Sequence, residues 1–216
     1  MNGITILLVD DHPVVRAGYR KLLERQGHYT ITAEAENAAE AYRLYRKVTP
    51  DIVVMDLSLP GASGIEAIRL IRGFDRNARI LVFTMHQSTA FASKAFEAGA
   101  SGYVTKSSEP EELIAAVAAV ARGERALSDD IARELGAERL SGRRSPVEDL
   151  GPRELEILRL IASGRTSEAI SQSLSLSLKT VQNYHSAIKS KLSVHTDADL
   201  VWIAVAAGLL QRQPFE

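Results

Sequence analysis

Three acidic residues and one lysine follow short apolar runs in the first half of the chain. Asp10 and Asp11 close the run "LLVDD", Asp56 follows "VVM", and Lys106 follows "GYVT". Short apolar runs that alternate with helical patterns are typical of buried parallel strands, whose carboxyl ends share one edge of the sheet. Ligands of open α/β sheets bind just outside that edge, so we expect these four side chains to meet in one shallow cleft.

The chemistry of such a cleft follows from its charges. Carboxylates crowded together repel one another unless a hard cation is present. Mg²⁺ suits the site because it takes a few oxygen ligands, keeps several waters and also binds phosphate oxygens. Asp56, at the end of a strand, is then placed to attack a phosphorus atom in line and form an aspartyl phosphate. Thr84 and Lys106 would hold the oxygens of that product.

The composition is that of an ordinary globular protein of one large or two small domains. Of its 216 residues, 45% are apolar and 25% are charged, as in typical soluble domains. The chain has no cysteine, which excludes disulfides and Cys-ligated zinc. It also has no 18-residue apolar run and no charged leader with a cleavage site, so we expect a soluble cytoplasmic protein with no membrane contact.

Net charge alone does not indicate a nucleic-acid partner. Residues 1–140 hold 17 basic and 19 acidic side chains, and residues 141–216 hold 9 and 8. A DNA-binding domain is usually clearly basic. Any DNA-binding hypothesis for the second half must therefore rest on where its polar side chains lie.

Periodicity predicts five βα units in the first domain, which we place at residues 1–122. Together they form a doubly wound, flavodoxin-like α/β sheet of five parallel strands. Strands are expected at 4–9, 30–35, 52–56, 79–84 and 102–105, and helices at 13–26, 38–48, 64–74, 88–98 and 110–122. Three helix starts carry a polar cap with an acid three residues later: Asn37 with Glu40, Ser63 with Glu66, and Ser108 with Glu111.

The second half of the chain reads differently. Residues 123–148 suggest a short helix and then a linker, "SGRRSPVED", and residues 149–216 show no strand pattern. This second domain is predicted to be small and all-helical, with Trp202 in its core or in a dimer seam. Its helices are expected at 152–163, 167–174, 177–192 and 196–207.

The predicted helix at 177–192 has one apolar and one polar face. Val181, Ile188 and Leu192 share the face that would pack on the domain. The short helix before it, followed by a tight turn at Ser175, matches a helix-turn-helix. Gln and Asn can each make two hydrogen bonds to adenine, and Lys can bind guanine or phosphate. The candidate DNA contacts are Lys179, Thr180, Gln182, Asn183, Ser186, Lys189 and Lys191, and Arg165 is a further candidate phosphate contact.

These motifs together resemble the NarL/FixJ family of two-component response regulators over almost the full chain. The stretch from "LGPRELEIL" to "HSAIKSKL" is similar to that family's LuxR-type domain, and the TVxxY and "HTDADL" portions are most similar to the GacA/UvrY branch. The resemblance implies a receiver domain that is phosphorylated on an aspartate and a helix-turn-helix domain that regulates transcription. It implies a phosphoacceptor and not an enzyme, whose only chemistry is its own phosphorylation and slow dephosphorylation.

The resemblance also assigns roles residue by residue. Asp56 corresponds to the phosphoacceptor, and Asp10, Asp11, Asp56 and the backbone carbonyl of Ser58 correspond to the Mg²⁺ ligands. Thr84, Tyr103 and Lys106 correspond to the phosphate-sensing set, in which Tyr103 rotates inward as Thr84 moves. The implied partners are a sensor histidine kinase or phosphorelay donor, double-stranded DNA, and a second copy of the chain on activation.

Some positions depart from the family pattern. Gly151 stands where a threonine cap is usual, which removes a hydroxyl bond to the amide near Glu154; a glycine cap costs only about tenths of a kcal/mol. Gln182 and Tyr184 replace a frequent Lys and His of the recognition helix, which lowers its positive charge. Operator sequences of relatives therefore do not transfer.

Simpler interpretations exist for single residues. Asp10 and Asp11 could be ordinary helix-cap residues, and Lys106 a solvated surface lysine. His86 could gate the attacking water in dephosphorylation, although a solvent-facing loop histidine explains it as well; His12 could tune the acidic pair or be a surface residue. The recognition face could be nothing more than a polar helix exterior.

Two other functions are open at this point. The helical domain could serve protein contact or RNA-linked control instead of promoter binding. The sheet could also belong to a phosphatase or hydrolase with an aspartate nucleophile, but such enzymes commonly place a second acid two residues after the nucleophile, where this chain has Ser58.

Overall fold

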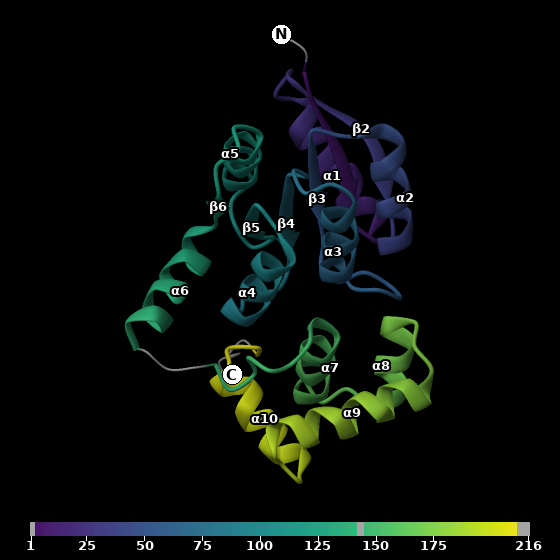
Figure 1. Ribbon diagram of the computed structural model, residues 1–216, viewed down its shortest axis with the longest axis vertical. Coiled ribbons are helices and arrows are strands. Elements are labelled where there is room, and N and C mark those ends of the chain that lie inside the picture. The colour runs from purple at the N-terminus through teal and green to yellow at the C-terminus, as the bar shows by residue number, and fades with distance from the viewer. Residues whose placement is uncertain (1–2, 142–144, 211–216) are drawn as a thin grey trace.

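The computed structural model describes residues 3–141 and 145–210. A twisted parallel sheet with helices on both faces is followed by a group of four helices (Figure 1). The strand order is β2-β1-β3-β4-β5-β6, and every neighbouring pair is parallel. The strands are β1 (Ile4–Val9), β2 (Tyr29–Ala35), β3 (Ile52–Met55), β4 (Ile80–Thr84), β5 (Gly102–Thr105) and β6 (Ala126–Leu127).

The predicted doubly wound sheet is confirmed, with one strand more than the five expected. β6 has only two residues, which pair with Gly102 and Tyr103 at the edge of the sheet. Two residues carry too little alternation to produce a sequence pattern. The extra strand matters because it ties the chain after the fifth helix back onto the sheet.

Helices cover the two faces of the sheet according to the alternation of the strand side chains. They are α1 (Pro13–Glu24), α2 (Ala38–Val48), α3 (Gly64–Phe74), α4 (Thr89–Ala98) and α5 (Pro110–Ala121). The next helix, α6 (Asp129–Ser141), packs on α4 and extends away from the sheet (Figure 1). Leu8, Val54 and Phe83 belong to the buried cluster formed with α1 and α5. Val9 and Met55 belong to the cluster formed with α2, α3 and α4.

Two of the three predicted helix caps are present. Asn37 Oδ1 accepts a hydrogen bond from the Glu40 amide at 2.9 Å, and Ser63 and Glu66 form a reciprocal capping box. The predicted cap at Ser108 is wrong, because α5 begins at Pro110 with Glu109 as the preceding residue. Proline is favoured at the first helical position, and its place in the chain decides where this helix starts.

The second domain is all-helical, as predicted. Its helices are α7 (Pro152–Ala162), α8 (Ser167–Leu174), α9 (Leu178–Leu192) and α10 (Asp197–Ala206). Leu155, Leu158, Ile170, Val181 and Ile188 lie fully buried in its core. Residues 142–144 of the expected linker, 211–216 of the expected second domain and 1–2 of the first lie outside the described residues.

Trp202 and Gly151 bear on two expectations for this domain. Trp202 is 74% exposed, so the core position is wrong, while the dimer seam stays a prediction. Its neighbours Leu200 and Ala204, on the other side of α10, fill the core instead. At Gly151 only one half of a capping box is present: the Glu154 carboxylate accepts a hydrogen bond from the Gly151 amide at 2.7 Å, and the hydroxyl bond to the Glu154 amide is missing, as expected.

The helical domain is docked against the carboxyl edge of the sheet, with α7 and α10 beneath α3 and α4 (Figure 1). The Ser88 hydroxyl at the start of α4 donates to the Ala207 carbonyl after α10, at 3.1 Å. The Gly61 amide donates to the Leu174 carbonyl at the end of α8, at 3.2 Å. One buried apolar cluster runs through both domains, so the contact is a packed interface. Among the described residues, no helix combines the length and apolarity that crossing a membrane requires.

Candidate functional site

Lys106 joins two of the predicted acids at the carboxyl edge of the sheet. Its ammonium donates to Asp10 Oδ2 at 2.6 Å and to Asp56 Oδ2 at 2.5 Å. The three residues follow β1, β3 and β5, and their side chains are at most 8% exposed. Burial alone would lower the pKa of Lys106, but the Asp56 and Asp10 carboxylates raise it above its ordinary value, so the lysine stays charged.

Backbone contacts fix the position of Asp56. Its amide donates to the Val9 carbonyl at 2.9 Å, and the Ser58 amide donates to Asp56 Oδ1 at 3.2 Å. Gly64, the first residue of α3, packs so closely on this segment that a Cβ there would lie 2.0 Å from the Asp56 carbonyl oxygen. The strand end and the start of α3 therefore meet backbone to backbone.

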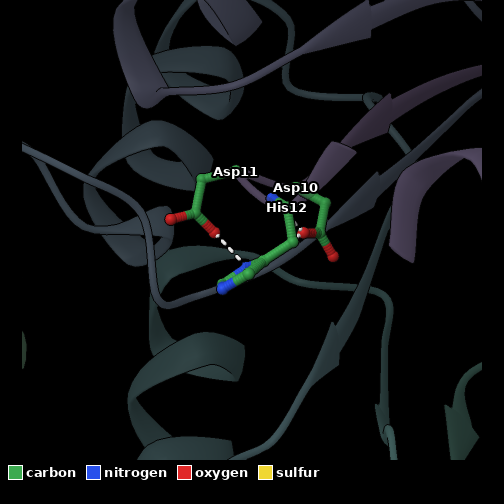
Figure 2. Close-up of side chains that lie close together, drawn as sticks. All are labelled: Asp10, Asp11 and His12. Atoms are coloured by element: carbon green, nitrogen blue, oxygen red, sulfur yellow. Dashed lines mark hydrogen bonds and ion pairs between the residues drawn. The ribbon is translucent and has the colours of Figure 1, made fainter. Parts of the chain in front are cut away.

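Asp11 lies beside this cluster with its side chain 30% exposed. Figure 2 shows its carboxylate directed at the His12 imidazole, with Oδ1 and Nδ1 2.8 Å apart. Burial raises the pKa of Asp11, His12 opposes that rise, and Asp56 and Asp10 add to it. One ligand atom each from Asp10, Asp11 and His12 lies within 4.8 Å of the others, so the acidic pair has the spacing that a cation needs. His12 itself is a surface side chain, 66% exposed.

Thr84 and Tyr103 lie near the cluster, and each makes a hydrogen bond that involves the backbone there. Thr84 is fully buried, and its carbonyl accepts a hydrogen bond from the Lys106 amide at 2.7 Å. The Tyr103 hydroxyl donates to the His86 carbonyl at 2.8 Å, and the ring is fully buried. The inward position that was expected for Tyr103 only after phosphorylation is thus already present, because this carbonyl gives the buried hydroxyl a partner.

His86 is buried and not a solvent-facing loop residue, which corrects the simpler sequence interpretation. It is 6% exposed, stacks on Phe91 with ring centroids 3.9 Å apart, and places Nε2 3.0 Å from the Ser58 hydroxyl. Burial, followed by the nearby Arg159, lowers the pKa of His86 to about 3, so the imidazole is neutral at physiological pH. Arg159 belongs to α7, so the docked helical domain contributes to this shift, which no local sequence pattern reports.

Helix α7 brings charged residues to the domain interface. Arg153 and Glu156 are 6% and 4% exposed and form an ion pair at 2.5 Å. Burial raises the pKa of Glu156; Arg153 opposes the rise, and Asp56 adds to it. Burial is the main cause of this rise, and the charge of the phosphoacceptor candidate is a minor one. Sequence reasoning missed this pair, because charged residues in a helix ordinarily indicate a solvated face.

Helix α9, which carries the candidate reading face, lies on the side of the helical domain away from the sheet (Figure 1). Lys179, Gln182, Asn183 and Ser186 are exposed there, while Val181 and Ile188 pack inside. Thr180 is half-buried, and its hydroxyl lies 2.8 Å from that of Ser177, which caps the helix. Lys189 and Lys191 are ion-paired within the domain, with Asp197 and Glu154 respectively.

Comparison with known proteins identifies both parts of the chain. Residues 6–118 match the model of the response regulator receiver domain, and residues 148–204 match that of the LuxR family of bacterial regulatory proteins. The chain is a two-component response regulator. It carries a LuxR-type DNA-binding domain, and its receiver is a phosphoacceptor and not an enzyme, so the hydrolase alternative falls away.

Relatives that match over nearly the full chain indicate the branch of the family to which the regulator is similar. It is 36% identical to the response regulator UvrY of Escherichia coli K12 over 212 residues, 97% of each chain. This likeness confirms the resemblance to the GacA/UvrY branch. A crystal structure of a LuxR-family response regulator from Aurantimonas sp. SI85-9A1 is 64% identical over 64% of this chain and 99% of that chain, with a TM-score of 0.63.

A DNA-bound structure is also similar. RcsB from Salmonella enterica serovar Typhimurium, bound to the promoter rprA in the presence of the phosphomimetic BeF3-, has 29% identity and a TM-score of 0.67. The match covers 94% of this chain and 98% of that one. Both domains of the regulator therefore have counterparts in a relative that was captured on DNA.

Proposed function

We propose that the regulator accepts a phosphoryl group on Asp56 and thereby controls DNA binding by α9. The observation that carries the proposal is the bridge from Lys106 to both Asp10 and Asp56. It supports Asp56 as the nucleophile, because a carboxylate held at a strand end by a fixed cation is oriented for in-line attack and keeps a partner for the new phosphate oxygens. Thr84 and Lys106 hold those oxygens, with Tyr103 as their buried neighbour.

Mg²⁺ is the cofactor of this proposal. Asp10 and Asp11 offer closely spaced hard oxygen ligands, which Mg²⁺ prefers. The pKa of Asp11 is raised mainly by burial and further by the neighbouring Asp56 and Asp10 carboxylates, whose repulsion a cation would relieve. Asp10, Asp11, Asp56 and the Ser58 carbonyl would hold the ion. When bound, it neutralises charge on the incoming phosphoryl group. His12, exposed beside Asp11, adjusts the local charge without belonging to this set.

Phosphorylation acts on the docked arrangement through charge. A phosphoryl group brings about −1.5 to −2 charges at neutral pH, and Glu156 already senses the charge of Asp56 across the interface. Adding charge at Asp56 raises the free energy of the docked state, so the population shifts toward released DNA-binding domains. Ser58 bonds to both Asp56 and His86, so these contacts are the first to change.

DNA contacts come from the exposed face of α9. Gln182 and Asn183 read bases, Ser186 and Thr180 contact neighbouring groups, and the lysines bind phosphates. The phosphate contacts are Lys179, Lys189 and Lys191. One small domain of low net charge binds weakly, so two copies act together on half-sites about 10 bp apart.

The domain boundaries and partners belong to the same proposal. We place the receiver at 1–122, the short helix and linker at 123–148, and the DNA-binding domain at 149–216. The phosphoryl donor is a sensor histidine kinase or a phosphorelay protein, and activation produces a homodimer on double-stranded DNA. A cytoplasmic location follows, since the chromosome lies there.

The test is labelling of the full chain by acetyl phosphate with Mg²⁺. Asp56→Asn keeps the shape of the side chain and removes its nucleophilic charge, so acid-labile label should disappear. Asp51→Asn is the matched control, because Asp51 lies at the start of β3 and bonds to Thr5, away from the cluster. Label retained in the Asp56 variant and lost in the control would refute the assignment.

A further inference from the structure

The lysines at the C-terminal end of α9 already have acidic partners in the absence of DNA. Lys189 Nζ lies 2.7 Å from Asp197 Oδ1, and Lys191 Nζ lies 2.6 Å from Glu154 Oε2. By contrast, within the described part of the chain, Lys179 at the other end of the reading face has no acid at ion-pair distance. The lysines at the C-terminal end of the reading face are therefore ion-paired, whereas Lys179 at its other end is available to a DNA phosphate.

Asp197 is the more distinctive of the two acids. Glu154 has a structural duty, since it also caps α7 through the Gly151 amide. Asp197, the first residue of α10, has no such duty, because Thr196 and Asp199 form the capping box there. Its Oδ1 instead lies 2.7 Å from both Lys189 Nζ and His185 Nε2, two side chains of α9. The Asp197 side chain is 59% exposed, on the surface that carries the end of the reading face.

We propose that Asp197 limits the affinity of the regulator for DNA by occupying the cation of Lys189. This rests on the proposed contact between Lys189 and a DNA phosphate. An aspartate carboxylate and a phosphate oxygen compete for the same ammonium group, so Lys189 must leave Asp197 before it binds DNA. After that exchange the carboxylate keeps only His185 as a partner and lies near the phosphate backbone, which it repels. Asp197 is thus a positioning residue, whose carboxylate binds the Lys189 ammonium in the absence of DNA.

The expected effect of Asp197 on DNA affinity is small, because its ion pair with Lys189 is exposed to solvent. An exposed ion pair of this kind is weak and is screened by salt. Its removal should tighten binding about two- to fivefold at low salt. It should also steepen the decrease of log K with log[salt] by up to about 0.9, the contribution of one phosphate contact. Phosphate contacts carry no sequence information, so affinities for selected and random sequences should rise by the same factor.

The experiment measures binding of the full chain to a short mixed-sequence duplex and to a sequence enriched by in vitro selection, across a salt series. Asp197→Asn keeps shape and removes the charge. Glu111→Gln, on the exposed start of α5, is the control for net charge alone. Lys189→Ala and the double variant complete a cycle, because an effect that acts through Lys189 vanishes when Lys189 is absent.

The outcomes separate the inference from the function on which it rests. Tighter binding by Asp197→Asn on both duplexes, absent in the Lys189→Ala background, supports the inference. If Lys189→Ala weakens binding and Asp197→Asn does not tighten it, the inference fails while the DNA contact stands. If Lys189→Ala changes nothing, the proposed contact itself is wrong. A gain equal to that of Glu111→Gln, or one that persists without Lys189, overturns the role of Asp197.

Discussion

The receiver and the DNA-binding domain both pair lysines with acids, but at very different depths. Lys106 lies buried between Asp10 and Asp56, whereas Lys189 meets Asp197 on an exposed surface. A buried charge that loses its partner is strongly destabilising. An exposed pair contributes little and exchanges partners readily. The buried cluster is suited to hold a fixed geometry for chemistry, and the exposed pair is suited to release its lysine to DNA.

The sharpest way to break this comparison is to remove the buried cation. Lys106→Met should lower the free energy of unfolding by about 3 kcal/mol in the absence of Mg²⁺, because two buried carboxylates lose their partner. Urea denaturation measures this, and added Mg²⁺ should recover part of the loss. The same substitution at the exposed Lys179 should change stability by no more than about 0.5 kcal/mol. Equal losses of stability at Lys106 and Lys179 would mean that burial between two acids does not set the cost of removing a lysine.

The comparison predicts a different readout on the exposed face. Gln182→Ala should leave stability nearly unchanged and remove about 1–3 kcal/mol of discrimination at one base position. Selection of binding sequences from a random pool, with wild type and variant in parallel, would show relaxed preference at that position. Uniform weakening on all sequences would instead indicate that Gln182 contacts the backbone of the DNA.

Between the two regions lies Glu156, and its substitution should have the smallest of the three effects. Its folded pKa is raised, so the carboxyl stabilises the docked state below its ordinary pKa of 4.5 and loses that contribution as pH rises through the folded value. At neutral pH the charge opposes docking. Glu156→Gln removes that charge but leaves the buried Arg153 without its ion-pair partner. The two effects oppose each other, and the loss of the pair should prevail, with hydrogen-exchange protection of α7 weaker by on the order of 1 kcal/mol.

The same variant should also respond less to phosphorylation, because the charge that repels Asp56 is gone. Glu168→Gln, on the exposed start of α8, provides a matched control for the change of net charge. Stronger protection of α7 in the Glu156 variant would mean that the cost of burying the Glu156 charge outweighs the loss of its ion pair with Arg153.

Sequence patterns predicted the elements that depend on local order. Nearly every strand and helix appears within one or two residues of its expected place, since alternation and caps are local signals. The convergence of Asp10, Asp56 and Lys106 also follows from strand order, because parallel strands end at one edge. Patterns failed at Ser108, where Pro110 sets the helix start, and at β6, which is too short to show alternation.

Residues at the domain contact could not be predicted in this way. His86 and Glu156 look like surface residues in the sequence, but both are buried in the docked arrangement. Trp202 shows the reverse case, because a large aromatic side chain suggested a core position and the core was filled by its neighbours on α10. Local periodicity reports which face of a helix is apolar, but not which other domain will cover the remaining faces.

Gly64 shows how little room the phosphoacceptor segment leaves. Even the methyl group of alanine would overlap the carbonyl oxygen of Asp56 there. The segment after β3 and the start of α3 therefore pack backbone against backbone, with no side chain between them. Any movement of the strand end must push directly on the first turn of the helix, as one rigid part pushes another. Because Gly64 lacks a Cβ, α3 is in direct contact with the residue proposed to receive the phosphoryl group, and the two should move together.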